Sequence, residues 1–265
     1  MSSSASARAG VLAVFVAVLV AVTNTAVSTA GHALDAHPAK AAPAVQSMVV
    51  GASGQILFGP RTIKARAVTT EVSTRRCAVG KGTPLAALLA VQHAGGPRAR
   101  LRDYGHCGPA PADSGQLFVY SLAGESNTGQ NGWEYKVGHL SGSTGAAEES
   151  GPFGDGRLLT SGQRVLWFWC VAQTGGCQRT LDFTTSPTSP APGSELTVTV
   201  TGYENAGNGA PVTGATVTID QAHQSAITGP DGTATLAAPS TPGRYRISVE
   251  KAGLVTSFPQ TITVT

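Results

Sequence analysis

Two of the three tryptophans, Trp167 and Trp169, lie in the segment 164–171, which reads RVLWFWCV. Because side chains alternate between the two faces of a strand, these tryptophans share one face while Leu166 and Phe168 share the other. Both faces are apolar, which is typical of a strand buried on both sides. The segment therefore predicts a central strand around which the first half of the chain is built.

Further apolar runs in the first half predict more strands and one helix. The strand-like runs are 55–58, 62–68, 72–79, 98–104, 117–122 and 133–137. Of these, 98–104 alternates with arginine and predicts a polar edge strand, whereas 117–122 is apolar on both faces. Thr83 followed by Pro84 is typical of a helix start, and a leucine stripe follows it. The polar side of this helix is thin, so we expect it to pack on a sheet.

The pattern changes after residues 184–193, which read TTSPTSPAPG and predict a linker. Short alternating strands follow, separated by turn sequences such as Pro-Asp-Gly and Thr-Pro-Gly. They lie at 196–201, 215–219, 233–236, 245–249 and 261–264. This spacing predicts a small β-sandwich over residues 194–265.

The N-terminus has the pattern of an export signal. Arg8 precedes an apolar stretch of signal-peptide length, and small residues follow it. We expect a signal peptide over residues 1–33 with cleavage between Ala30 and Ala33; an uncleaved membrane anchor is the alternative. The Ala/Pro-rich segment 34–54 predicts a flexible lead-in, which leaves 55–183 as the first folded domain. The chain is thus expected to be secreted, and to meet a membrane only through the signal peptide before cleavage.

Composition narrows the fold and the class of partner. Charged residues make up 12% of the chain and the net charge is +3, with no Lys/Arg cluster beside the tryptophans, which argues against nucleic acid. Abundant glycine and proline favour β-structure with many turns. We predict a mainly β fold: an α+β first domain, then a β-sandwich.

Four cysteines lie in the first half: Cys77, Cys107, Cys170 and Cys177. In an exported protein an even number predicts disulfides. Of the three possible pairings, we favour the two sequence-local bonds, Cys77–Cys107 and Cys170–Cys177. A metal site is the competing interpretation, but there is no CxxC and no histidine pair with ligand spacing, so we predict no metal and no cofactor.

The first half resembles a known extracellular family. The segment Gly132-Trp-Glu-Tyr-Lys-Val-Gly138, followed by Leu159-Thr-Ser-Gly-Gln-Arg-Val-Leu-Trp167, resembles an extracellular domain of unknown function similar to the C-terminal domain of transcobalamin. The resemblance covers residues 55–183, with a glutamine at position 163 where an acidic residue is usual. It implies a β-grasp-like fold, a small sheet with one helix packed on it. The relative binds corrinoids, which makes capture of a cobalamin-like molecule an alternative function.

The second half also has a family resemblance. The segments Pro211-Val-Thr-Gly-Ala-Thr-Val217, Gly229-Pro-Asp-Gly-Thr-Ala234 and Pro242-Gly-Arg-Tyr245 are similar to bacterial Ig-like or carboxypeptidase-regulatory-like domains. Such domains act as stalks or auxiliary modules, so the resemblance implies a spacer without its own activity.

Catalytic constellations are weak in this sequence. There is no Gly-x-Ser-x-Gly elbow, and His139 near Ser141 is a chance-level pair. The carboxylates Glu148, Glu149 and Asp155 lie on a Gly/Ser-rich loop, where such residues mostly serve solvation. We therefore predict no catalytic residue and no enzyme, with an uncharacterised hydrolase as a second alternative.

The aromatic residues are the best candidates for a ligand site. Trp133 follows the polar loop 124–132, and Tyr135 lies two residues further on the same strand face. They predict an apolar contact surface, whereas the competing interpretation is that both rings belong to the core. On this basis the chain is expected to be a secreted, non-enzymatic binding or surface-interaction protein. Its partner would be an unidentified extracellular ligand: a glycan, a small molecule or a protein.

Overall fold

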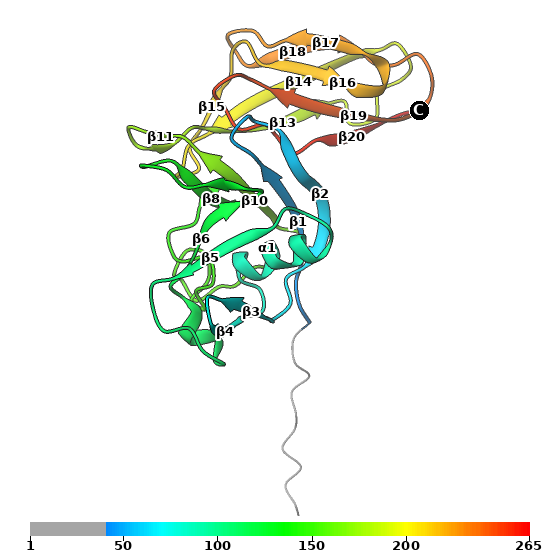
Figure 1. The fold of residues 1–265 in the computed structure, drawn as a ribbon. Coiled ribbons are helices and arrows are strands. Elements are labelled where there is room, and N and C mark those ends of the chain that lie inside the picture. Colours follow the sequence, from blue (N-terminus) through cyan, green and yellow to red (C-terminus); the bar gives the residue numbers. More distant parts are fainter. Residues whose placement is uncertain (1–40) are drawn as a thin grey trace, which may run out of the picture. The chain divides into compact units, whose positions relative to one another are not determined.

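The computed structural model describes residues 41–265, and the chain is mainly β with one α-helix in that range (Figure 1). The expected signal peptide, its cleavage site and residues 34–40 of the expected lead-in lie outside the described residues. Within residues 41–265, no helix is both long and apolar enough to span a membrane.

A five-stranded sheet organises the first half, in the order β2-β1-β10-β8-β9 (Figure 1). Its strands are β1 (Ala44–Val50), β2 (Ile56–Lys64), β8 (Gly132–Val137), β9 (Leu140–Ser141) and β10 (Arg164–Cys170). β1 and β10 are parallel, and the other neighbours are antiparallel. The prediction of a central strand at 164–171 is confirmed, because β10 lies in the middle of this sheet.

The segment 34–54 is not a flexible lead-in over its described part. Residues 44–50 form β1, which pairs with both β2 and β10 and buries Val45, Met48 and Val49 completely. The surrounding Ala/Pro-rich composition concealed this strand, whose stability comes from two long-range partners rather than from local propensity. β2 also differs from prediction, since one strand runs through Gly59-Pro60 where a turn between two strands was expected.

Helix α1 (Pro84–His93) packs on one face of the sheet, as predicted. The Thr83 hydroxyl caps the helix by accepting a hydrogen bond from the amide of Ala86 at 3.2 Å. Leu85 and Leu88 are fully buried, in the same core as Val45, Val165 and Trp167 of the sheet. The arrangement is β-grasp-like, as expected. It combines the β1–β2 hairpin, helix α1 and a central pair of parallel strands, β1 and β10.

Three small sheets complete the first half. They are β3 (Val68–Val72) with β4 (Arg75–Val79); β5 (Ala99–Asp103) with β6 (Leu117–Leu122) and β7 (Glu125–Ser126); and β11 (Ala172–Gln173) with β12 (Gly176–Cys177). A short 3-10 helix, η1 (Pro111–Ser114), lies between β5 and β6. Both predicted disulfides are confirmed: Cys77–Cys107 joins the middle of β4 to the loop after β5, and Cys170–Cys177 closes the β11–β12 turn.

The second half is a β-sandwich of two four-stranded sheets. One sheet contains β13 (Thr180–Ser186), β14 (Glu195–Tyr203), β15 (Gly209–Pro211) and β18 (Thr233–Ala237). The other contains β16 (Thr216–Ile219), β17 (Gln224–Ile227), β19 (Gly243–Glu250) and β20 (Gln260–Val264), with the 3-10 helix η2 (Asp220–Ala222) after β16. Alternate residues of both sheets meet in one apolar core that includes Val198, Val217 and Ile247.

The sandwich begins earlier in the chain than predicted. β13 pairs with β14 over residues 180–186, so the end of the expected 55–183 domain and the start of the 184–193 linker belong to the sandwich. Leu181 and Phe183 enter its core, whereas Thr184 and Ser186 are exposed, and the Thr/Ser content of this strand gave it the composition of a linker. We call residues 41–179 the sheet module and residues 180–265 the sandwich module.

The second face of the five-stranded sheet is covered by the sandwich module. Leu166 and Phe168 of β10 pack in one cluster with Val255 and Phe258, and Met48 of β1 joins them. The two modules therefore share a buried apolar contact, and β10 is enclosed on both faces as its sequence indicates.

The two disulfides should contribute unequally to stability. They span 30 and 7 residues, for which chain entropy gives about 3.7 and about 2.5 kcal/mol. We expect the Cys77→Ala/Cys107→Ala variant to lose more free energy of unfolding in urea than the Cys170→Ala/Cys177→Ala variant. The reverse order would contradict this account.

Candidate functional site

The two residues predicted to bind ligand lie in the core. Trp133 and Tyr135 on β8 are only 3% and 5% exposed, and both belong to the apolar core that helix α1 also enters. The Trp133 ring meets Trp169 edge-on at 5.8 Å, and the Tyr135 ring lies 5.3 Å from Trp167. The expectation of an exposed apolar surface is thus corrected: the face that the two rings share lies inside this core.

Polar contacts fix both side chains in this position. The indole nitrogen of Trp133 donates a hydrogen bond to the carbonyl oxygen of Glu125 at 3.0 Å. The Tyr135 hydroxyl donates to the carbonyl oxygen of Thr144 at 3.0 Å, and burial raises its pKa to about 12. The polar loop before β8 had suggested exposure, but it folds back and supplies the acceptor for Trp133, while the loop after β9 supplies the acceptor for Tyr135.

The weaker candidates from the sequence also have structural partners. The Asp155 carboxylate pairs with Arg157, and the hydrogen bonds from Arg157 lower the pKa of Asp155. Glu125 of β7, a carboxylate that was not singled out above, also has a partner and accepts a hydrogen bond from the amide of Ala52 at 3.0 Å. Within residues 41–265, no three His, Cys, Asp or Glu side chains gather closely enough to hold a metal ion.

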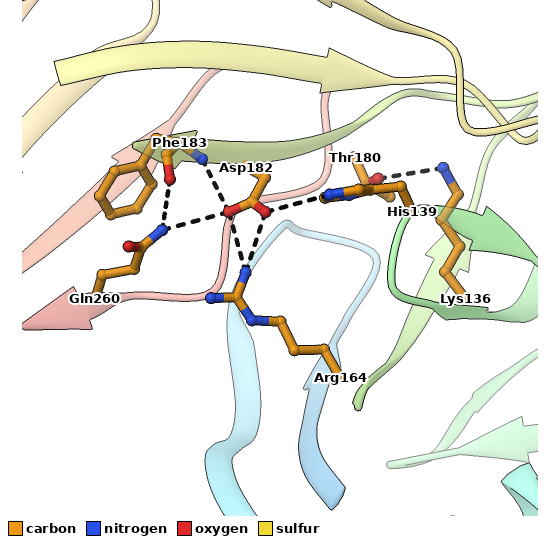
Figure 2. Close-up of polar contacts among 7 residues, drawn as sticks. All are labelled: Lys136, His139, Arg164, Thr180, Asp182, Phe183 and Gln260. Carbon is orange, nitrogen blue, oxygen red and sulfur yellow. Dashed lines mark hydrogen bonds and ion pairs between the residues drawn. The ribbon is translucent and has the colours of Figure 1, made fainter. Parts of the chain in front are cut away.

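A polar cluster joins the two modules beside their apolar contact (Figure 2). Lys136 of β8 is completely buried, and its ammonium donates three hydrogen bonds into the sandwich module. The acceptors are the Thr180 hydroxyl at 3.2 Å, the Tyr203 carbonyl at 3.0 Å and the Glu204 carbonyl at 2.8 Å. All three donors of the ammonium are used, so Lys136 fixes the junction and is not available to a ligand.

Asp182 of β13 is the second centre of this cluster (Figure 2). Its carboxylate accepts two hydrogen bonds from Arg164 at 3.0 and 3.2 Å and lies 3.6 Å from the His139 ring. Burial lowers the pKa of His139, although Asp182 acts in the opposite direction. His139 also stacks on Tyr203 with ring centroids 3.6 Å apart. These contacts link strand ends of both modules, so the cluster acts as a structural connection.

A further candidate surface, which the sequence did not reveal, lies on β5, β6 and the residue after β5. Arg102 pairs in register with Phe118, which places their side chains on one sheet face. On the same face, the Tyr104 ring lies 5.9 Å from Phe118, and the Arg102 guanidinium lies 5.0 Å from the centre of Tyr120. We call these four residues the aromatic–arginine face.

This face is open to solvent. Tyr104 is 62% exposed and Phe118 is 40% exposed, although the run 117–122 is apolar on both faces. A cleft of about 300 Å³ adjoins them, lined also by Gln130 and Glu134. Burial raises the pKa of the Glu134 carboxyl. Trp133 contributes to the cleft lining, but its low exposure leaves most of the contact area to the four residues of the face.

A sequence signal for this face exists but is incomplete. The Arg-x-Arg-x-Tyr pattern ending at Tyr104 and the Phe-x-Tyr pattern at Phe118 each mark an outward row on a strand. Only the pairing of β5 with β6 across a long loop shows that the two rows adjoin.

Comparisons with known proteins give little for this chain. The sequence shows no match to a protein-family model and no match among curated proteins. Among solved structures, the D00-D0 domain of Intimin is similar, with 16% identity, 57% of this chain and 90% of that chain covered, and a TM-score of 0.27. A TM-score this low supports no conclusion about the fold or function of this chain.

The burial of Trp133 makes a stability prediction. Replacing it in Trp133→Ala should cost about 3–5 kcal/mol of unfolding free energy, the range for a buried aromatic. Tyr104→Ala removes an exposed ring and is the control; it should change the unfolding free energy by less than about 0.5 kcal/mol. Urea denaturation of both variants checks this, and a small loss in Trp133→Ala would contradict the core assignment.

The buried Lys136 makes a pH prediction. Burial lowers its pKa to about 8, whereas an unfolded lysine titrates near about 10.4. Between these values the unfolded state binds more protons, so the lysine's contribution makes stability rise with pH from about 8 to about 10.4.

Lys136→Met should remove that rise, and Lys64→Met, at an exposed lysine, should keep it. Urea denaturation of the wild type and both variants across this pH range measures the difference. An unchanged pH dependence in Lys136→Met would show that Lys136 is not responsible.

Proposed function

We propose that this chain is a non-enzymatic binding protein that works outside the cytoplasm and contacts its ligand through the aromatic–arginine face. The observation that carries the proposal is the grouping of Tyr104, Phe118 and Arg102 on one open sheet surface. Tyrosine, phenylalanine and arginine are the residue types enriched where proteins bind partners. Exposed aromatic side chains that gather on one surface commonly mark an interaction site.

The surroundings of the face support a preformed binding surface. Asp103 at the end of β5 accepts hydrogen bonds from the amides of Gly105 and Cys107 and pairs with Arg75 at 3.3 Å. The Cys77–Cys107 disulfide ties the same loop to β4. A surface held in this way loses little conformational entropy when a ligand binds.

An extracellular location is supported by the disulfides and by the N-terminal sequence pattern. Two disulfides are typical of proteins that mature in an oxidising compartment. In this proposal the sheet module carries the ligand contact, and the sandwich module is a firmly attached auxiliary domain.

The two alternatives have less support. The five-stranded sheet offers no open face to a cobalamin-like molecule, because α1 packs on one face and the sandwich module packs on the other. A hydrolase would need a nucleophile beside its base. The contacts of His139, the best histidine candidate, within residues 41–265 are with Asp182 and Tyr203, and no serine or cysteine side chain is among them.

Arrays of glycans and of peptides, probed with the mature chain, test the proposal. We expect any ligand found to bind the Tyr104→Ala/Phe118→Ala variant at least tenfold more weakly, because the two rings supply the apolar contact area. The matched control is Ile227→Ala, which removes a 63% exposed side chain from the sandwich module and should change nothing. Failure of the wild type to bind on either array, or binding that survives the double substitution, would overturn the proposal.

A further inference from the structure

We propose that the ligand of the aromatic–arginine face is an acidic polysaccharide, held along a surface that runs from this face into the neighbouring cleft between β3 and β5. This inference rests on the proposed function and adds the chemical class of the ligand. The sequence had suggested no basic cluster beside aromatic residues, but folding creates one.

The surface is longer than the aromatic–arginine face alone. A second cleft of about 590 Å³ lies between β3 and β5, and its lining includes Arg98, Arg100 and Leu89. Tyr120 lines both this cleft and the smaller one beside Phe118, so the two clefts adjoin at this ring. An elongated surface of this kind fits a chain of linked units better than a single small molecule.

Three arginines carry the positive charge of this surface: Arg98, Arg100 and Arg102, all exposed. Among the ion pairs of residues 41–265, none involves any of the three, so their charges are available to a ligand. A guanidinium can donate two parallel hydrogen bonds to one carboxylate or sulfate group.

Nearby carboxylates reduce this charge but do not cancel it. Glu71 lines the larger cleft and lies opposite Arg76 in the β3–β4 register, but none of the ion pairs within residues 41–265 involves its carboxylate. Asp103 is occupied by Arg75 and by backbone amides, and Glu134 lines the smaller cleft. The linings of the two clefts therefore hold three arginines against two carboxylates, Glu71 and Glu134. The small positive excess that remains suits a polymer whose acidic groups are separated by neutral sugar rings.

The aromatic rings favour a polysaccharide over a nucleic acid. Tyr104 and Phe118 are tilted by 57° to each other, so they do not form parallel platforms for successive bases. Each ring can instead pack against the C–H face of one sugar. Arg102 is already held against Tyr120, so its ordering costs little when an acidic group arrives.

The test measures binding of the mature chain to four polymers: heparin for sulfate, polygalacturonate for carboxylate, dextran as the neutral polysaccharide, and oligo(dT) for single-stranded nucleic acid. We expect binding to heparin, polygalacturonate or both, at least tenfold tighter than to dextran or oligo(dT). Raising the salt concentration should weaken it, because screening reduces attraction between exposed charges.

Two variants with the same loss of charge locate the site. Arg98→Gln/Arg100→Gln/Arg102→Gln should bind the acidic polymer at least tenfold more weakly, with a shallower salt dependence. The control Arg61→Gln/Arg157→Gln/Arg244→Gln removes three exposed arginines elsewhere and should bind within about twofold of the wild type, since local contacts rather than net charge decide the affinity.

The possible failures are distinguishable. Equal binding to dextran, preference for oligo(dT), or equal losses in both arginine variants would overturn the acidic-polysaccharide inference. If none of the four polymers binds but an array ligand depends on Tyr104 and Phe118, this inference fails and the proposed function stands. If no ligand depends on those two rings, both fail.

Discussion

The enclosure of β10 on both faces is the interaction on which the rest of this structure depends. Val165 and Trp167 lie under helix α1, whereas Leu166 and Phe168 lie under Val255 and Phe258 of the sandwich module. Because adjacent side chains of a strand point in opposite directions, one strand belongs to two cores. Separating the modules would expose the second of these cores to water, so the apolar contact holds them together.

Polar groups at the edge of this contact define how the modules are oriented. Lys136 and Arg164 reach from the sheet module to acceptors on β13 and β14, at positions that only one arrangement satisfies. A buried ammonium is costly unless every donor is paired, which makes other orientations of the modules unfavourable. Apolar burial supplies the affinity between the modules, and the buried charges select the geometry.

This division of roles leaves the periphery of the sheet module for binding. The tryptophans and Tyr135 stabilise the core, whereas Tyr104 just after β5 and Phe118 on β6 lie outside the five-stranded sheet. A disulfide and the Asp103 contacts hold that part of the chain in place without covering it. Residue type alone did not distinguish core aromatics from surface aromatics here, because burial depends on which elements pack over each face.

The sequence by itself determined the features that depend on local pattern: the central strand, the helix start at Thr83, most sandwich strands and both disulfide pairs. Alternation, capping and short cysteine separations are properties of neighbouring residues. The tertiary structure alone decided that residues 44–50 form a strand, that Trp133 is covered, and that Arg102 lies beside Phe118 and Tyr120. Each of these depends on segments distant in the chain, and no local pattern records which distant segment will cover a face or leave it open.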